Sequence, residues 1–127
     1  MKEYFEINIK SNTRWIVQES YSLGSRNEQY GSEQKIRASA EIVDYQENPG
    51  VFDIDGKVRG YSLYVYVKYS ISCPDNTFYN GVSSFEEFFT AKDPYSYKVS
   101  LERARKTILG KIKNYLIGKS KDKCHNA

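Results

Sequence analysis

The residue types best suited to catalysis are scarce in this sequence. The chain of 127 residues has one histidine, His125, which stands close to the C-terminus, and two cysteines, Cys73 and Cys124. A histidine base must be held within hydrogen-bond reach of its nucleophile, and a chain end is a poor place to hold one. Structural zinc takes four nitrogen or sulfur ligands, more than these residues supply. The sequence therefore predicts neither a Ser-His-Asp or Cys-His centre nor a zinc site.

Two acidic clusters are the remaining candidates for chemistry. Asp53, Asp55 and Gly56 begin like a calcium-binding loop, but that pattern requires a glutamate six residues after the glycine, where Ser62 stands. Glu86 and Glu87 are adjacent, and adjacent residues of a helix do not face each other. No glycine-rich phosphate loop is present. We therefore predict a non-enzymatic protein with no metal and no cofactor.

Charge is distributed unevenly along the chain. Residues 1–98 hold 11 Lys and Arg against 14 Asp and Glu, whereas residues 99–127 hold 8 against 2. Because a basic segment can neutralise phosphates, the candidate nucleic-acid-binding residues are Arg103, Lys106, Lys113 and Lys119. The same segment could simply keep the protein in solution. The net charge of +3 is also well short of the strongly basic balance of nucleic-acid-binding domains.

Tyrosine is the residue type that most favours a binding function. The chain has 12 tyrosines, and tyrosine is enriched where proteins contact one another. The candidate partner-binding residues are Tyr21, Tyr30, Tyr64, Tyr66 and Lys68. The last three share one side of a predicted strand and could instead stack the bases of single-stranded nucleic acid. We favour a protein partner, for an accessory or inhibitor protein of phage or mobile-element type, and keep nucleic acid as the alternative.

The stretch Tyr61–Cys73 carries the strongest structural signal and is predicted to be the central strand of a sheet. Its odd-numbered residues are aliphatic, aromatic or Cys, and its even-numbered ones are Ser, Tyr and Lys, as in a strand with one buried face. Further strands are predicted at Tyr4–Lys10, Arg14–Gln18, Ile36–Tyr45 and Thr77–Val82, with a meander over 36–82. Asp55-Gly56 predicts a two-residue hairpin turn of type I′. The polar residues 19–34 predict a long loop.

Two helices are predicted after the strands. Ser84 and Glu87 have the spacing of a capping box. Phe85, Phe88 and Phe89 would then share one face of a short helix. Asp93-Pro94 is a typical helix start, and it predicts a long helix that continues to about Ile117 and ends at Gly118.

The long helix has one apolar stripe that contains an unexpected cation. Leu101, Ala104, Ile108, Ile112 and Leu116 fall on this stripe at helical spacing. Arg105 falls inside it, and a guanidinium pressed against a core must find acceptors. One interpretation is that its stem packs while its head reaches water. The sharper hypothesis is a structural ion pair of Arg105 with Glu86, Glu87 or Asp93, and a role in binding an anionic group comes third.

Together these elements predict one α+β domain over 1–118 and a flexible basic tail over 119–127. The long helix packs on one face of an antiparallel sheet of about four to six strands. No apolar run approaches the roughly 20 residues that cross a bilayer, and the N-terminus lacks the apolar core of a secretory signal. We expect a cytoplasmic location, in which both thiols would be free.

Overall fold

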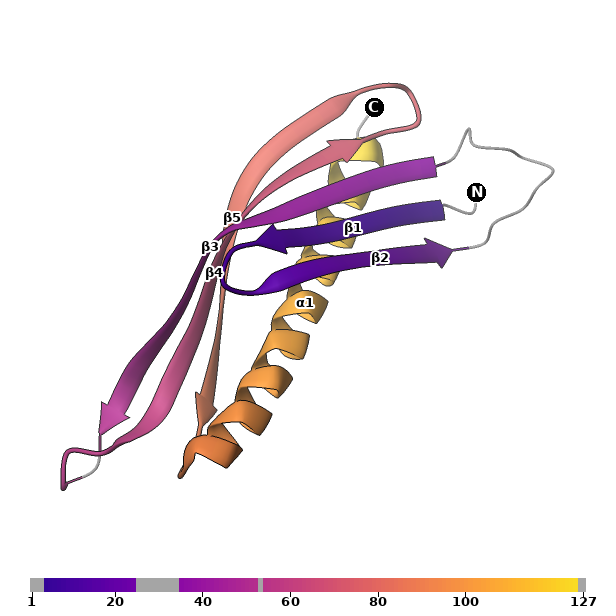
Figure 1. Ribbon diagram of the computed structural model, residues 1–127. Coiled ribbons are helices and arrows are strands. Elements are labelled where there is room, and N and C mark those ends of the chain that lie inside the picture. Colours follow the sequence, from indigo (N-terminus) through magenta and orange to yellow (C-terminus); the bar gives the residue numbers. More distant parts are fainter. Residues whose placement is uncertain (1–3, 25–34, 53, 126–127) are drawn as a thin grey trace.

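The computed structural model describes residues 4–24, 35–52 and 54–125, which form one sheet and one long helix. The strands are β1 (Tyr4–Asn12), β2 (Ile16–Gly24), β3 (Lys35–Phe52), β4 (Val58–Ser72) and β5 (Phe78–Thr90). The helix α1 (Pro94–His125) spans the length of the sheet on one of its sides (Figure 1). The predicted α+β class, with a C-terminal helix packed on a mostly antiparallel sheet, is confirmed.

The strands lie in the order β2-β1-β3-β4-β5. β3, β4 and β5 form the predicted antiparallel meander, and the predicted central strand is β4, an interior strand one place from the middle. β1 and β2 form an antiparallel hairpin, and β1 pairs in parallel with the first half of β3. This parallel joint attaches the N-terminal hairpin to one half of a long, bent meander (Figure 1).

A β-bulge lies in the middle of β3, where the register shifts between Ile42 and Asp44. A bulge bends its strand and increases the local twist, and the long strands of the sheet do bend near their middle (Figure 1). The extra residue also changes which side chains face inward. Before the bulge even-numbered residues such as Ile42 are buried, and after it Tyr45 is buried.

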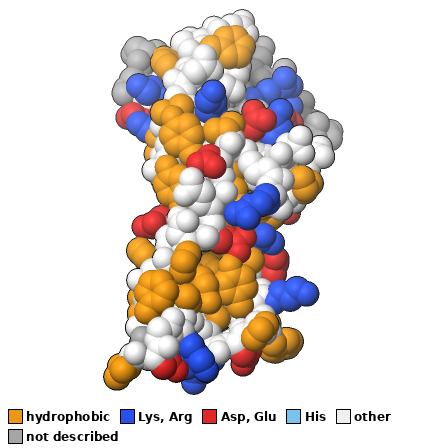
Figure 2. All heavy atoms as spheres, turned by 60° about the vertical axis from the view of Figure 1, so that its left-hand side comes forward, with side chains coloured by type: hydrophobic (Ala, Val, Ile, Leu, Met, Phe, Trp, Pro, Cys, Tyr) orange, Lys and Arg blue, Asp and Glu red, His pale blue; other side chains and the backbone are white. Residues whose placement is uncertain are grey.

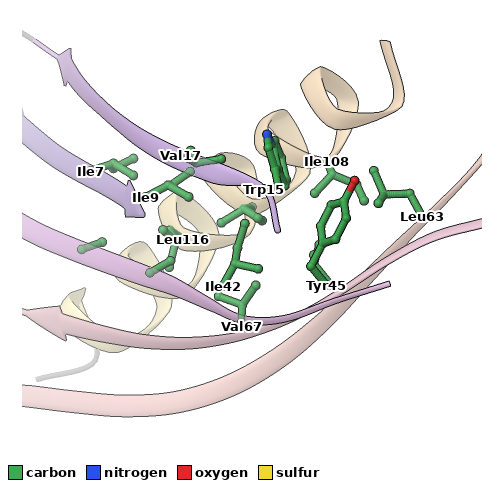
Figure 3. Close-up of a cluster of buried hydrophobic side chains, with 14 of the residues drawn as sticks. Ile7, Ile9, Trp15, Val17, Ile42, Tyr45, Leu63, Val67, Ile108 and Leu116 are labelled. Carbon is green, nitrogen blue, oxygen red and sulfur yellow. The ribbon is translucent and has the colours of Figure 1, made fainter. Parts of the chain in front are cut away.

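The core lies between the sheet and α1 (Figure 3). The sheet contributes the inward-facing residues of its strands, among them Ile7, Ile9, Val17, Ile42, Leu63, Val65, Val67 and Ile71. The helix contributes the predicted stripe, Leu101, Ala104, Ile108, Ile112 and Leu116. Ile108, Leu116 and Leu63 have no exposed surface. The prediction that this stripe packs on the buried face of β4 is therefore confirmed.

The segment predicted as a short helix belongs to β5, so that prediction is wrong. Phe85 and Phe89 lie opposite Val65 and Tyr61 of β4 and point inward, whereas Phe88 points outward. The ring of Phe89 stacks on Tyr61 with centroids 5.4 Å apart. The strand buries Phe89, packs Phe85 against the core and pairs its backbone with β4, and these tertiary contacts outweigh the local capping signal.

The predicted hairpin after β3 is present, but its turn differs from type I′. The chain leaves β3 at Phe52 and enters β4 at Val58, which is too long a connection for a two-residue turn. Type I′ requires positive φ at both central residues. Gly56 has a φ of 83°, whereas among the described non-glycine residues the positive φ belongs to Asn76.

The polar segment predicted as a loop over 19–34 is in part a strand. Its first six residues, 19–24, belong to β2 and pair with β1. The remaining residues, 25–34, lie outside the part of the chain that the structure describes. The sequence pattern did not predict this part of β2, because β2 is an edge strand whose polar side chains, such as Gln18 and Ser22, face solvent.

The predictions for the two cysteines and for the C-terminal segment are both corrected. A disulfide links Cys73 to Cys124, and their Cα atoms are 5.4 Å apart. The two thiols are therefore bonded rather than free. Within the predicted flexible tail, 119–127, the helix continues past Gly118 to His125. A glycine inside a helix costs about 1 kcal/mol relative to alanine. The covalent link from Cys124 to Cys73 offsets that cost.

Candidate functional site

The candidate site is the face of the sheet opposite α1, which we call the outer face. Its residues alternate with the buried ones along each strand. On β4 they include Tyr64, Tyr66 and Lys68, between the core residues Leu63, Val65 and Val67. The structure thus brings three of the predicted partner-binding residues together on one surface. Tyr64 and Tyr66 are half-buried, and Lys68 is exposed.

Apolar side chains of β5 extend this surface to the edge of the sheet. Phe78, Val82 and Phe88 are 69%, 52% and 73% exposed. They lie opposite Ser72, Lys68 and Ser62 of β4. The face turned toward the reader in Figure 2 carries a group of hydrophobic side chains in its lower half. Exposed apolar groups gathered on one face are typical of interaction surfaces.

A shallow depression of about 730 Å³ lies on the outer face. Its lining includes Lys10 of β1, Glu41 of β3, Lys68 of β4 and Asn80 of β5. The depression therefore spans four strands. Its lining offers positively charged hydrogen-bond donors and a negatively charged acceptor.

The charges of the outer face balance each other. Its four cations, Lys10, Lys35, Arg37 and Lys68, are matched by four carboxylates, Glu6, Glu41, Asp44 and Glu86. Several are already paired, as Lys35 Nζ lies 2.5 Å from Glu6 Oε1. A surface for nucleic acid needs an excess of positive charge. Among the described residues, the outer face lacks that excess of positive charge near its tyrosines.

The predicted nucleic-acid-binding residues lie on α1. Arg103 and Lys106 are exposed, whereas Lys113 and Lys119 are half-buried. Lys113 Nζ lies 5.0 Å from the ring centroid of Tyr21, and Lys119 Nζ lies 5.9 Å from that of Tyr115. The first two cations are open to a ligand, while the other two rest on aromatic rings.

Tyr21, the fourth predicted partner-binding residue that the structure describes, does not join the outer face. Tyr21 points toward α1, and burial raises the pKa of its hydroxyl. Tyr30 lies outside the described residues. The two tyrosines were predicted together because they border one polar segment, but β2 turns Tyr21 inward at the position opposite Ile7.

Arg105 takes partners other than those predicted. Its Nη1 donates to Glu102 at 2.7 Å, and its Nη2 lies 3.8 Å from Glu47. Glu86 and Glu87 belong to β5, where the Glu87 carboxylate lies 3.0 Å from Lys111 Nζ. The predicted ion pair of Arg105 with Glu86 or Glu87 is therefore wrong, because it assumed that these glutamates lie on a helix.

The guanidinium of Arg105 lies in a cage that sequence reasoning missed. Its Cζ is 5.4 Å from the ring centroids of both Trp15 and Tyr45. Its Nε and Nη2 donate to the Tyr45 hydroxyl at 3.0 and 2.8 Å. Tyr45 in turn donates to Glu47 Oε2 at 2.6 Å. The Trp15 and Tyr45 rings of the cage, seen in Figure 3, border the core.

Glu47 is the acceptor on which this cluster converges. Tyr97 of α1 also donates to it, at Oε1. Burial alone would raise the pKa of Glu47, but the hydrogen bonds from Tyr45 and Tyr97 outweigh it and hold the pKa below its usual value. Burial and the Glu47 carboxylate raise the pKa of Tyr45 to about 12. These hydrogen bonds between side chains of β3 and α1 join the helix to the sheet.

The chain was compared with protein families and with curated proteins. No protein-family model matches the chain, and no curated protein is similar to it at a significant level. Over the described residues, no helical segment has the length and apolarity needed to cross a bilayer. In the same residues, no three His, Cys, Asp or Glu side chains come together as metal ligands.

Proposed function

We propose that this protein is a small non-enzymatic binding protein whose outer face engages a protein partner, in the manner of phage or mobile-element accessory and inhibitor proteins. The observation that carries the proposal is the exposure of Phe78, Val82 and Phe88 beside Tyr64 and Tyr66 on a surface of balanced charge. Tyrosine is enriched among the few residues that supply most of the energy of protein interfaces, and exposed apolar side chains gathered on one face mark interaction sites. The depression beside Lys68 supplies polar contacts that would fix the orientation of the partner.

The proposal is tested by capture of a partner from the source cell. The tagged wild-type protein is compared with a Tyr64→Ser/Phe88→Ser double variant, which removes two outer-face rings and leaves the core intact. Lys106→Ala on α1 serves as the matched control. We expect the same captured protein with wild type and control, and its loss with the double variant. Equal capture by all three proteins would contradict the assignment of the outer face.

Nucleic acid remains the second candidate because Arg103 and Lys106 are exposed on the solvent side of α1. Cations of this kind bind phosphates without regard to sequence, and such binding weakens with salt. An electrophoretic-shift assay with single- and double-stranded oligonucleotides at low and moderate salt tests it. Salt-sensitive binding that is lost in Lys106→Glu/Lys113→Glu would support it, and no binding at low salt would remove it.

The cytoplasmic location also stays a proposal, and the disulfide makes it testable. A reducing cytoplasm keeps most protein thiols free, whereas Cys73 and Cys124 are bonded in the structure. Rapid alkylation of thiols in lysed source cells, followed by mass analysis, counts the free thiols of the cellular protein. Two alkylated cysteines would support the cytoplasm, and none would place the protein in an oxidising compartment.

A further inference from the structure

β5 is an edge strand of the described sheet, so one row of its backbone groups has no neighbouring described strand to pair with. The register of β4 and β5 pairs odd-numbered residues with odd-numbered ones, and Ala91 N donates to Arg59 O across this ladder at 3.1 Å. Bonded and non-bonded pairs alternate in an antiparallel ladder. The even-numbered residues of β5 therefore direct their N–H and C=O groups away from β4. The contact of Lys111 Nζ with Glu86 O, 3.0 Å, approaches from that free side.

Three of the usual protections of an edge strand, namely proline, lysine and a bulge, are missing from β5, although Glu86 and Glu87 place charge on it. Natural edges are blunted by proline, by lysine or by a bulge. The sequence of β5 contains neither proline nor lysine, and its register with β4 is unbroken over 13 residues. Its even-numbered side chains include the exposed Phe78, Val82 and Phe88. Backbone groups and apolar side chains are thus presented together along one edge.

We propose that β5 pairs antiparallel with β5 of a second copy of this chain, around a two-fold axis at Ser83, so that two sheets become one. This inference goes beyond the proposed function, because it concerns the edge of the sheet and a copy of the same chain. An isologous contact of this kind requires only that one strand be complementary to itself.

The self-complementarity of β5 fixes the position of the axis. Bonded pairs across the edge must join even-numbered residues, which an axis at Ser83 satisfies. Phe78 then lies opposite Phe88 of the second copy, twice by symmetry, and the exposed rings cover each other. Moving the axis by one residue in either direction places Phe78 opposite Glu86 or Thr90. The axis at Ser83 is therefore the one that pairs aromatic with aromatic.

Lys111 is the single described side chain bound to this edge. It contacts Glu86 O, and it also holds the Glu87 carboxylate at 3.0 Å. Glu86 lies toward the end of the proposed contact, whereas Val82 and Ser84 lie beside the axis. Lys111 can release the carbonyl and keep the carboxylate, so pairing that starts at the axis meets no obstacle from it.

The mass of the protein in solution is the first test. We expect sedimentation equilibrium to show a shift from 14.7 kDa toward twice that mass as the concentration rises from micromolar to millimolar. Val82→Pro removes an N–H that faces away from β4, which an edge strand tolerates. It should stay monomeric while melting like the wild type. If Val82→Pro does not fold, Val82→Lys replaces it as an edge-blocking variant.

Cross-linking at the axis is the second test. Ser83 and its copy would form a non-bonded pair with Cα atoms about 4.5 Å apart, which is within disulfide reach. We expect Ser83→Cys to give a covalent dimer on mild oxidation, and the matched control Ser22→Cys on β2 to give none. A wild type that stays monomeric throughout, equal cross-linking of the two variants, or a dimer that persists in both Val82 variants would overturn the proposal.

Discussion

Loss of the disulfide between Cys73 and Cys124 should remove a large part of the stability of this protein. The two cysteines are 51 residues apart in the sequence. In the loop-entropy model, a link over that separation destabilises the unfolded chain by about 4 kcal/mol. Total stabilities of small domains are about 5–15 kcal/mol. We therefore expect the double variant Cys73→Ser/Cys124→Ser to melt lower than the oxidised wild type by on the order of 15 °C.

The assay compares urea and thermal unfolding of the oxidised wild type, the reduced wild type and the double variant. The reduced wild type and the variant should coincide, because both lack the link and keep the same core. Amide exchange should accelerate most around Ser120 and Lys123, the last described turns before the link, where Lys123 lies over Tyr79 at 5.6 Å. Oxidised and reduced proteins that unfold within about 1 kcal/mol of each other would refute the loop-entropy argument.

Three further predictions follow from the core and the cage. Ile108→Asp places a charge at a position with no exposed surface, so the protein should fail to fold by circular dichroism, and a wild-type melt would contradict the packing of α1. Gly81→Ala should cost about 1–3 kcal/mol, because its Cβ would overlap the Tyr69 ring, whereas Gly118→Ala, with open space around it, should melt no lower than wild type. The pKa of Tyr45 is raised from 10.0 to about 12 in the folded protein. The contribution of Tyr45 to the free energy of unfolding is therefore full below pH 10 and is lost as the pH rises toward 12. Urea titrations across that range should show a smaller loss of stability in Tyr45→Phe than in the wild type.

The parts of the fold that follow a simple period were predictable from the sequence. The alternation of β4 identified its buried face, and the apolar stripe of α1 identified the helix residues that cover it. Both signals depend on the repeat of one element alone. The meander was predictable for the same reason, since neighbouring strands with short connections usually pair.

The failures share a physical cause, which is that distant residues decided the local structure. Ser84 and Glu87 have good capping spacing, but pairing with β4 placed them in a strand. Arg105 was recognised as anomalous, yet its acceptor Glu47 became available only through the bulge in β3. The approach of Cys124 to Cys73 depends on where a 32-residue helix ends against the sheet, which no spacing rule reports.

The parallel joint between β1 and β3 has a consequence for how the chain reaches its final form. β3, β4, β5 and α1 follow one another in the sequence, and short connections join them. The β1–β2 hairpin is synthesised first, and among the described strands its one partner outside the hairpin is β3, with Tyr4 paired to Lys35. Pairing between remote segments is slow because chain closure comes before any gain. We therefore expect the β1–β2 hairpin to dock on β3 after the antiparallel hairpins of the meander have closed from their turns.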